Sequence, residues 1–137
     1  MRYPVTLDIE AVGVLAGCPD IPEMHSVGDT VEEALKEAAD GLESAIEIYF
    51  DARRPVPLPS RAARGQKTVA ISALTAAKVL LHNEMLAQNV KKADLARALQ
   101  IAPSNVERIF RVRHKTRIET LEAALGCMGK HLDVRLA

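Results

Sequence analysis

The residues best suited to chemistry in this sequence are polar and basic side chains concentrated between residues 92 and 117. Serine, asparagine and arginine side chains can hydrogen-bond to base edges, whereas lysine and arginine neutralise phosphates. The candidates for base contacts are Ser104, Asn105 and Arg108, and those for phosphate contacts are Lys92, Arg111, Arg113 and Lys115. Five cations fall within residues 108–117 alone, so this segment predicts contact with a nucleic acid.

Two short helices joined by a tight turn are predicted to position these side chains. Apolar residues recur at helical spacing in both helices: Leu95, Ala96 and Leu99 in the first, and Val106, Ile109 and Phe110 in the second. Pro103 suits the first position of the second helix, where its missing N–H costs nothing. Gln100 stands where such turns usually carry glycine, and Ala102 is a weak N-cap. We interpret the pair as a DNA-binding helix-turn-helix.

The alternative interpretation is a plain αα-hairpin inside a helical bundle, which has the same periodicity. The charge distribution favours the nucleic-acid interpretation. The formal net charge of the chain is zero, but residues 1–60 carry four Lys/Arg against twelve Asp/Glu, and residues 61–137 carry fourteen against six. The two parts therefore have net charges of −8 and +8. The basic part suits a polyanion, and the acidic part suits either a basic protein or simple solvation.

The N-terminal half predicts a small sheet followed by one long helix. Residues 2–9 alternate as a strand, with Tyr3, Val5, Leu7 and Ile9 on one face and Asp8 on the solvent side. A turn at 10–13 leads to a second strand at 14–17, and a short extended piece is expected at 24–27. Thr30 and Glu33 form a capping box that starts a helix running to about residue 50. The proline-rich residues 53–60 predict an extended connector.

The C-terminal half predicts one more strand and two further helices. Residues 68–71 are expected to join the sheet of the first hairpin. Ser72 can cap a helix to about residue 88, which is apolar nearly all round and therefore wants burial on more than one side. Thr116 and Glu119 form a second capping box for a helix to about residue 128. The tail at 131–136 alternates apolar residues, and we expect it to pair with its counterpart in a dimer; a frayed tail is the alternative.

These elements predict an α+β fold with a small sheet and helix domain at 1–60, and a helical DNA-binding and dimerisation domain at 72–137. Residues 61–71 form a linker that includes the third strand, at about 67–71. The sequence contains no run of eighteen apolar residues, so no membrane span is predicted. Cys18 and Cys127 are isolated, so we expect no disulfide, no zinc site and a cytoplasmic location. No cofactor is predicted.

With both halves described, the whole chain resembles a HicB-type antitoxin of the subgroup with a C-terminal helix-turn-helix. The resemblance rests on ordered motifs: MRYPVTL at the N-terminus, DIPE at 20–23, GDTVEEAL at 28–35, IEIYF at 46–50, PLPS at 57–60, KVLL at 78–81, DLARAL at 94–99 and IETLEAA at 118–124. Members of the family often carry a glycine-rich turn and an aromatic strand after the first strand, and the chain departs from this at 10–15, where EAVGVL is slightly short and has no aromatic residue.

The resemblance implies a partial ribonuclease-H-like fold for the N-terminal domain. It also implies a partner, a basic mRNA-cleaving toxin of the HicA type, and repression of the protein's own operon at an operator in double-stranded DNA. The acidic N-terminal half would then cover the toxin. The candidate toxin contacts are Asp20, Ile21, Pro22, Glu33, Glu37 and Glu47. A homodimer or a higher homo-oligomer is expected.

Two other functions compete with the antitoxin. A ribonuclease-H-like nuclease could use Asp8, Glu10 and Asp20 as metal ligands, but no further carboxylate stands in a matching place, so we predict no catalysis. A repressor whose N-terminal domain senses a small ligand is the runner-up, although no glycine-rich phosphate cradle supports it. The histidines at 25, 82, 114 and 131 show no catalytic spacing; His114 is a further candidate for a phosphate contact.

Overall fold

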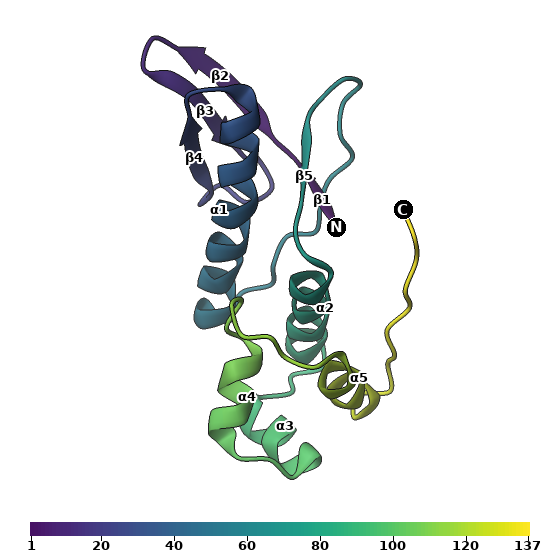
Figure 1. Cartoon of the computed structure of the whole chain (residues 1–137). Coiled ribbons are helices and arrows are strands. Elements are labelled where there is room, and N and C mark those ends of the chain that lie inside the picture. The colour runs from purple at the N-terminus through teal and green to yellow at the C-terminus, as the bar shows by residue number, and fades with distance from the viewer.

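The first strand of the chain is divided between two antiparallel sheets. The computed structural model describes all 137 residues, and its strands are β1 (Arg2–Pro4), β2 (Thr6–Glu10), β3 (Gly13–Gly17), β4 (His25–Gly28) and β5 (Thr68–Ala70). Strands β2, β3 and β4 form a three-stranded sheet in that order, whereas β1 pairs with β5 in a separate two-stranded sheet. The predicted α+β class is confirmed by these sheets and the helices around them (Figure 1).

The prediction that the strand near residues 68–71 joins the hairpin's sheet is wrong. β5 pairs with β1, with Tyr3 opposite Val69, and Val5 continues that ladder by donating its N–H to the carbonyl of Lys67 at 3.0 Å. The chain passes from one sheet to the other at Val5, so the two sheets share a continuous N-terminal segment but no ladder. A strand offers hydrogen bonds on both of its edges, and sequence alternation does not say which partner takes them.

Helix α1 (Val31–Ala52) packs on one face of the three-stranded sheet. Its start is the predicted capping site: the Glu33 N–H donates to the Thr30 hydroxyl oxygen at 3.1 Å, and the Glu33 carboxylate accepts the N–H of Asp29 at 2.8 Å. Gly28 allows β4 to approach the helix closely, because a Cβ there would lie 2.4 Å from the backbone N of Ala34. Helix and sheet together bury Val14 and Ala16.

The tip of the β2–β3 hairpin extends beyond the start of α1 (Figure 1). Tyr3 and Val5 are buried as predicted, but Ile9, expected on the same face, is 78% exposed, and Val12 in the turn is 79% exposed. Burial follows the predicted alternation only in part, because Pro4 is buried as well and the end of β2 is exposed on both faces, where the covering helix does not reach it. The hairpin therefore presents apolar side chains to solvent.

The C-terminal half consists of four helices: α2 (Ala73–Ala87), α3 (Lys92–Leu99), α4 (Pro103–Ile109) and α5 (Ile118–Gly126). The predicted connector is extended and anchored on α2, because the side chain of Asn83 bonds both the N–H (2.8 Å) and the carbonyl (3.0 Å) of Val56. Helix α2 packs against α1 and α5. It holds three buried polar residues, Thr75, Lys78 and His82, in a helix predicted to be apolar nearly all round.

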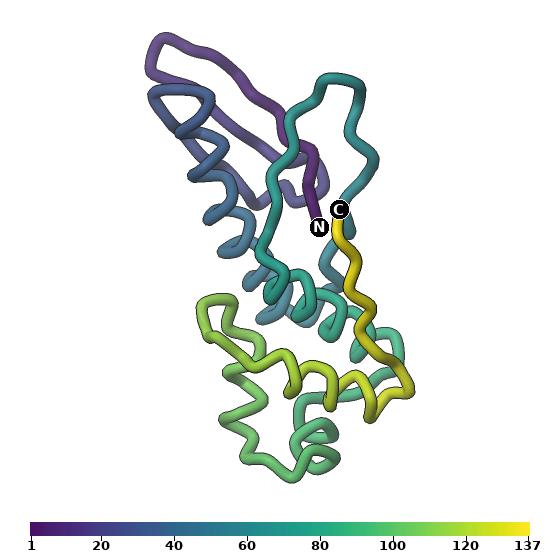
Figure 2. Tube along the Cα trace, turned by 45° about the vertical axis from the view of Figure 1, so that its right-hand side comes forward, coloured from purple at the N-terminus to yellow at the C-terminus, as the bar shows by residue number.

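The tail after α5 is extended and lies outside both sheets. In Figure 2 it runs from α5 back toward the N-terminus, and its side chains at Val134 and Leu136 are 92% and 98% exposed. Cys18 is buried and Cys127 exposed, and neither is in a disulfide. None of the helices combines the length and the apolar character that a membrane crossing requires.

Candidate nucleic-acid interface

Helices α3 and α4 are the two short helices that the sequence predicts, joined by the turn at residues 100–102. Their packing faces are buried at Leu95, Ala96, Val106 and Ile109. Gln100 ends α3 in the left-handed conformation, with φ 56° and ψ 44°, which costs roughly 1–2 kcal/mol for a residue with a Cβ. Ala102 caps α4 without a side-chain hydrogen bond. Both sequence observations about this turn are therefore confirmed.

The polar side chains of α4 face solvent beside the loop that leads to α5. Ser104, Asn105 and Arg108 are all exposed, as are Arg113 and Lys115 in the loop. An open hollow between α4, this loop and α5 is lined by Asn105, Arg108, Ile109, His114, Lys115 and Arg117, among others. The structure thus brings two candidates for base contacts, Asn105 and Arg108, together with two candidates for phosphate contacts, Lys115 and His114. Exposed polar side chains beside a hollow lined by cations suit the groove and backbone of double-stranded DNA.

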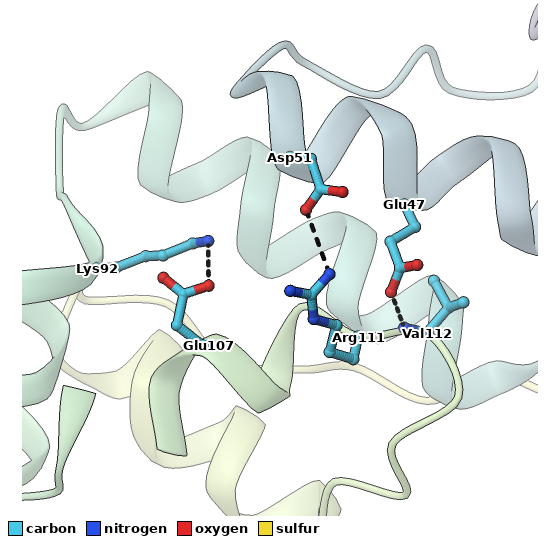
Figure 3. Close-up of polar contacts among 6 residues, drawn as sticks. All are labelled: Glu47, Asp51, Lys92, Glu107, Arg111 and Val112. Atoms are coloured by element: carbon cyan, nitrogen blue, oxygen red, sulfur yellow. Dashed lines mark hydrogen bonds and ion pairs between the residues drawn. The ribbon is translucent and has the colours of Figure 1, made fainter. Parts of the chain in front are cut away.

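Two of the predicted phosphate-binding cations are engaged by carboxylates within the protein (Figure 3). Nζ of Lys92 lies 3.1 Å from Oε2 of Glu107, and Nη1 of Arg111 lies 3.7 Å from Oδ1 of Asp51. All four side chains are partly exposed, so neither pair contributes much to stability. A phosphate that bound either cation would have to compete with the carboxylate that the cation already contacts.

Helix α1 reaches the loop after α4. Oε1 of Glu47 accepts the N–H of Val112 at 3.0 Å (Figure 3), and the ring of Phe50 packs edge-on against Phe110 with centroids 5.6 Å apart. The buried ring of His82 packs against both phenyl rings and its Nε2 donates to the carbonyl of Arg54 at 2.7 Å. Burial lowers the pKa of His82, so this ring is a neutral packing residue.

The N-terminal candidates for toxin contact differ in how available their side chains are. Ile21 is fully buried, and the carboxylate of Asp20 accepts two hydrogen bonds from Ser60, both at 2.9 Å. Glu33 is used in capping α1, and Glu47 in holding Val112. Pro22 and Glu37 are exposed. The DIPE loop itself is fixed to α1, because the Tyr49 hydroxyl donates to the Glu23 carboxylate at 2.6 Å.

The three carboxylates considered as metal ligands are spread over the N-terminal half. Asp8 and Glu10 are exposed on β2, on the face of the sheet turned away from α1, whereas Asp20 is bound to Ser60. No group of three or more His, Cys, Asp or Glu side chains is placed to hold a metal ion. His114 is exposed beside the hollow, where its Nδ1 lies 2.9 Å from the Thr116 hydroxyl oxygen.

Three residues at this interface are absent from the sequence-based set of contacts. Arg117 lines the hollow, and its place in the basic run could have identified it. Glu107 and Asp51 form ion pairs with two of the candidate cations, Lys92 and Arg111 respectively. Glu107 could have been suspected, because it lies on the same short helix as Arg108. Asp51 has no local signal, since its partner is sixty residues further along the chain.

Comparison with known proteins extends the similarity over nearly the whole chain. A family model described as the HicB-like antitoxin of bacterial toxin–antitoxin systems matches residues 2–80. Antitoxin HicB 2 of Photorhabdus laumondii is 44% identical over 98% of this chain and 95% of its own length. Antitoxin HicB of Pseudomonas fluorescens is 40% identical (96% and 90%), and that of Escherichia coli is 34% identical (98% and 98%). The similarity to these relatives therefore includes helices α3 to α5.

Proposed function

Because this chain belongs to the HicB-like antitoxin family, we propose that it neutralises a HicA-type, mRNA-cleaving toxin and represses its own operon by binding operator DNA. The observation that carries the proposal is the segregation of charge and surface between the two halves. Residues 1–60, with a net charge of −8, contain strands β1 to β4 and helix α1. Residues 61–137, with a net charge of +8, contain the α3–α4 pair.

For operator binding, α4 is the helix that enters the major groove. Its exposed Ser104, Asn105 and Arg108 contact base edges. Arg113 and Lys115 contact phosphates directly, whereas Lys92 and Arg111 do so after leaving their carboxylate partners. The α3–α4 pair then acts as a helix-turn-helix, with α3 supporting α4 from behind.

For toxin binding, the projecting hairpin is the best placed surface. Ile9, Val12 and Val27 are 78%, 79% and 56% exposed, and Asp8 and Glu10 are exposed on the same hairpin, on the sheet face opposite to Ile9. A hairpin that carries both exposed apolar side chains and carboxylates suits a basic partner: the apolar contacts give affinity, and the charges accelerate association. The acidic outer side of α1, including Glu37, extends the same surface.

The two functions divide the chain into a toxin-neutralising unit at 1–60, a linker with β5 at 61–71, and a DNA-binding and dimerisation unit at 72–137. We infer a homodimer, because Val134 and Leu136 in the tail and Leu80 on α2 leave apolar side chains exposed, and a two-fold protein matches a two-fold operator. The proposed role is binding without catalysis, in the cytoplasm where the mRNA-cleaving toxin acts.

The proposed toxin contact is tested by co-purification and calorimetry of the purified chain with the product of the neighbouring small reading frame. The double substitution Ile9→Ser with Val12→Ser should weaken the complex at least about tenfold, because two exposed apolar anchors are lost. The control is Ile118→Ser, which changes a 42% exposed isoleucine on α5, in the other half. Equal affinity of the double variant and the wild type would show that the toxin binds elsewhere.

A further inference from the structure

The loop between α4 and α5 has no helix or strand, yet side chains from two other helices hold its backbone. Nζ of Lys78, on α2, donates to the carbonyl oxygens of Arg111 and His114, each at 2.7 Å. From α1, the Glu47 carboxylate accepts the N–H of Val112 at 3.0 Å. Two side chains thus bind three backbone groups within four consecutive residues.

We propose that Lys78 and Glu47 are positioning residues for operator binding. They hold the loop at 111–116 so that the exposed Arg113 and Lys115 meet the phosphates that flank α4. The inference rests on the proposed DNA-binding function and adds to it two residues that touch no DNA. Fixing the backbone of a residue costs conformational entropy, and a loop that is already ordered in the free protein does not lose that freedom on binding.

Stability of the fold alone does not account for Lys78. Its side chain is fully buried, and burial lowers its pKa while the charges of Glu47 and Glu43 act in the opposite direction. A buried charge commonly stabilises a protein no more than an apolar side chain of the same size. What this lysine does achieve is to bring two carbonyl groups of one loop to the same point.

Neither carbonyl depends on Lys78 for its only hydrogen bond. The carbonyl of Arg111 also accepts the N–H of His114 at 3.0 Å, and the carbonyl of His114 accepts the N–H of Thr116 at 2.9 Å. Replacing Lys78 by methionine, which has a similar length, therefore leaves no orphaned acceptor. The substitution should mainly make the loop less ordered, and it should lower the stability of the protein only slightly.

The same contacts make α1 a structural part of the DNA-binding surface. Glu47 is on α1, and one helical turn later Asp51 reaches Arg111 and Phe50 packs on Phe110. The loop that presents Arg113 and Lys115 thus rests on the long helix of the N-terminal half. Operator affinity should consequently respond to substitutions on α1, more than fifty residues before the proposed recognition helix.

The test uses full-length variants Lys78→Met, Glu47→Ala and Glu47→Gln, with Lys36→Met and Asp40→Ala as exposed controls on α1. Binding to a duplex from upstream of the gene is measured by fluorescence anisotropy, amide exchange of Val112 and His114 by NMR, and stability by thermal unfolding. Lys78→Met and Glu47→Ala should each lower affinity about tenfold, which corresponds to one residue's ordering cost. Both should speed exchange, with a melting temperature close to that of the wild type.

Glu47→Gln keeps an oxygen that accepts from the Val112 N–H, so it should bind like the wild type, as should both controls. Affinity within twofold of the wild type for Lys78→Met and Glu47→Ala would overturn the inference. So would an equal loss in Glu47→Gln and Glu47→Ala, since the charge and not the hydrogen bond would then matter. If Lys78→Met fails to fold, the comparison of Glu47→Ala with Glu47→Gln decides whether the inference stands. A wild-type chain that binds no DNA overturns the proposed function instead, while amide exchange still reports on the loop.

Discussion

The ion pair between Lys92 and Glu107 should weaken operator binding, and Glu107→Gln should therefore strengthen it. The two side chains are 31% and 54% exposed, and their charged atoms are 3.1 Å apart. Exposed pairs of this kind are worth about 0.2–1 kcal/mol. A phosphate that takes Lys92 has to replace that interaction, so removing the carboxylate should raise affinity by about 1.5- to fivefold per subunit.

The salt dependence gives a second, independent magnitude. Each phosphate neutralised contributes a slope of about −0.9 to the plot of log affinity against log salt concentration. If Lys92 becomes a full phosphate contact in Glu107→Gln, the slope should steepen by up to about 0.9 per subunit. Fluorescence anisotropy with an operator duplex, measured between about 50 and 200 mM salt, gives both quantities. Glu122→Gln is the matched control, because it removes the same charge from an exposed site on α5.

Two results would refute this reasoning. An unchanged slope and affinity would mean that Lys92 does not approach the DNA. A loss of affinity confined to the operator, with other sequences unaffected, would mean that Glu107 itself contacts a base, for which the amino group of cytosine is the natural donor.

Two further predictions concern the proposed DNA contacts of Arg108 and Lys115 and the hydrogen bond between Tyr49 and Glu23. Arg108→Ala should weaken operator binding by about 1–3 kcal/mol and relax the sequence preference. Lys115→Ala should weaken binding to all sequences alike and flatten the salt slope by about one unit. If Arg108→Ala binds the operator as tightly as the wild type, α4 does not lie in the major groove. In Tyr49→Phe, loss of the hydroxyl that binds Glu23 should cost about 1–2 kcal/mol in unfolding free energy at neutral pH. That bond lowers the pKa of Glu23 below its ordinary 4.5, so its contribution is complete above that value and is lost as the pH falls through the lower, folded-state value. Chemical unfolding from pH 7 to pH 3 should show the two proteins converging in acid, and a difference that is constant with pH would contradict this assignment.

Much of the fold follows from local signals in the sequence. The capping residues Thr30 and Ser72 start α1 and α2 as predicted, since each accepts a hydrogen bond from the N–H three residues later. Alternation identified the first hairpin, and Pro103 marked the start of α4. These signals act over a few residues, which is why they can be recognised without a structure.

The predicted capping box of Thr116 and Glu119 is wrong, because α5 begins after Arg117 and has no side-chain cap. The other errors and omissions concern partners that are distant in the chain. β5 pairs with β1 and not with the hairpin, and Ile9 is exposed because α1 does not cover the end of β2. Lys78 looked like one polar residue in an apolar helix, yet its two carbonyl partners lie 33 and 36 residues further on. Periodicity gives the direction of a side chain but does not reveal which long-range group meets it.

The same limit applies to the candidate site. Residue type and clustering located the exposed set of Asn105, Arg108 and Lys115, which the structure brings to one hollow. They could not show that Arg111 is paired with Asp51, because that contact depends on how α1 crosses the end of α4. The carboxylates that modulate a cationic surface are therefore the part of such a site that requires a structure.

The most direct test of the account places both proposed functions in one cell. The chain is co-expressed with the neighbouring small reading frame, and growth and a reporter from its own promoter are measured together. We predict that the wild type restores growth and represses the reporter, whereas the double variant Arg108→Ala with Lys115→Ala restores growth but no longer represses. A wild type that fails to restore growth in the presence of a toxic neighbour would contradict the account. So would a double variant that loses both functions while remaining folded.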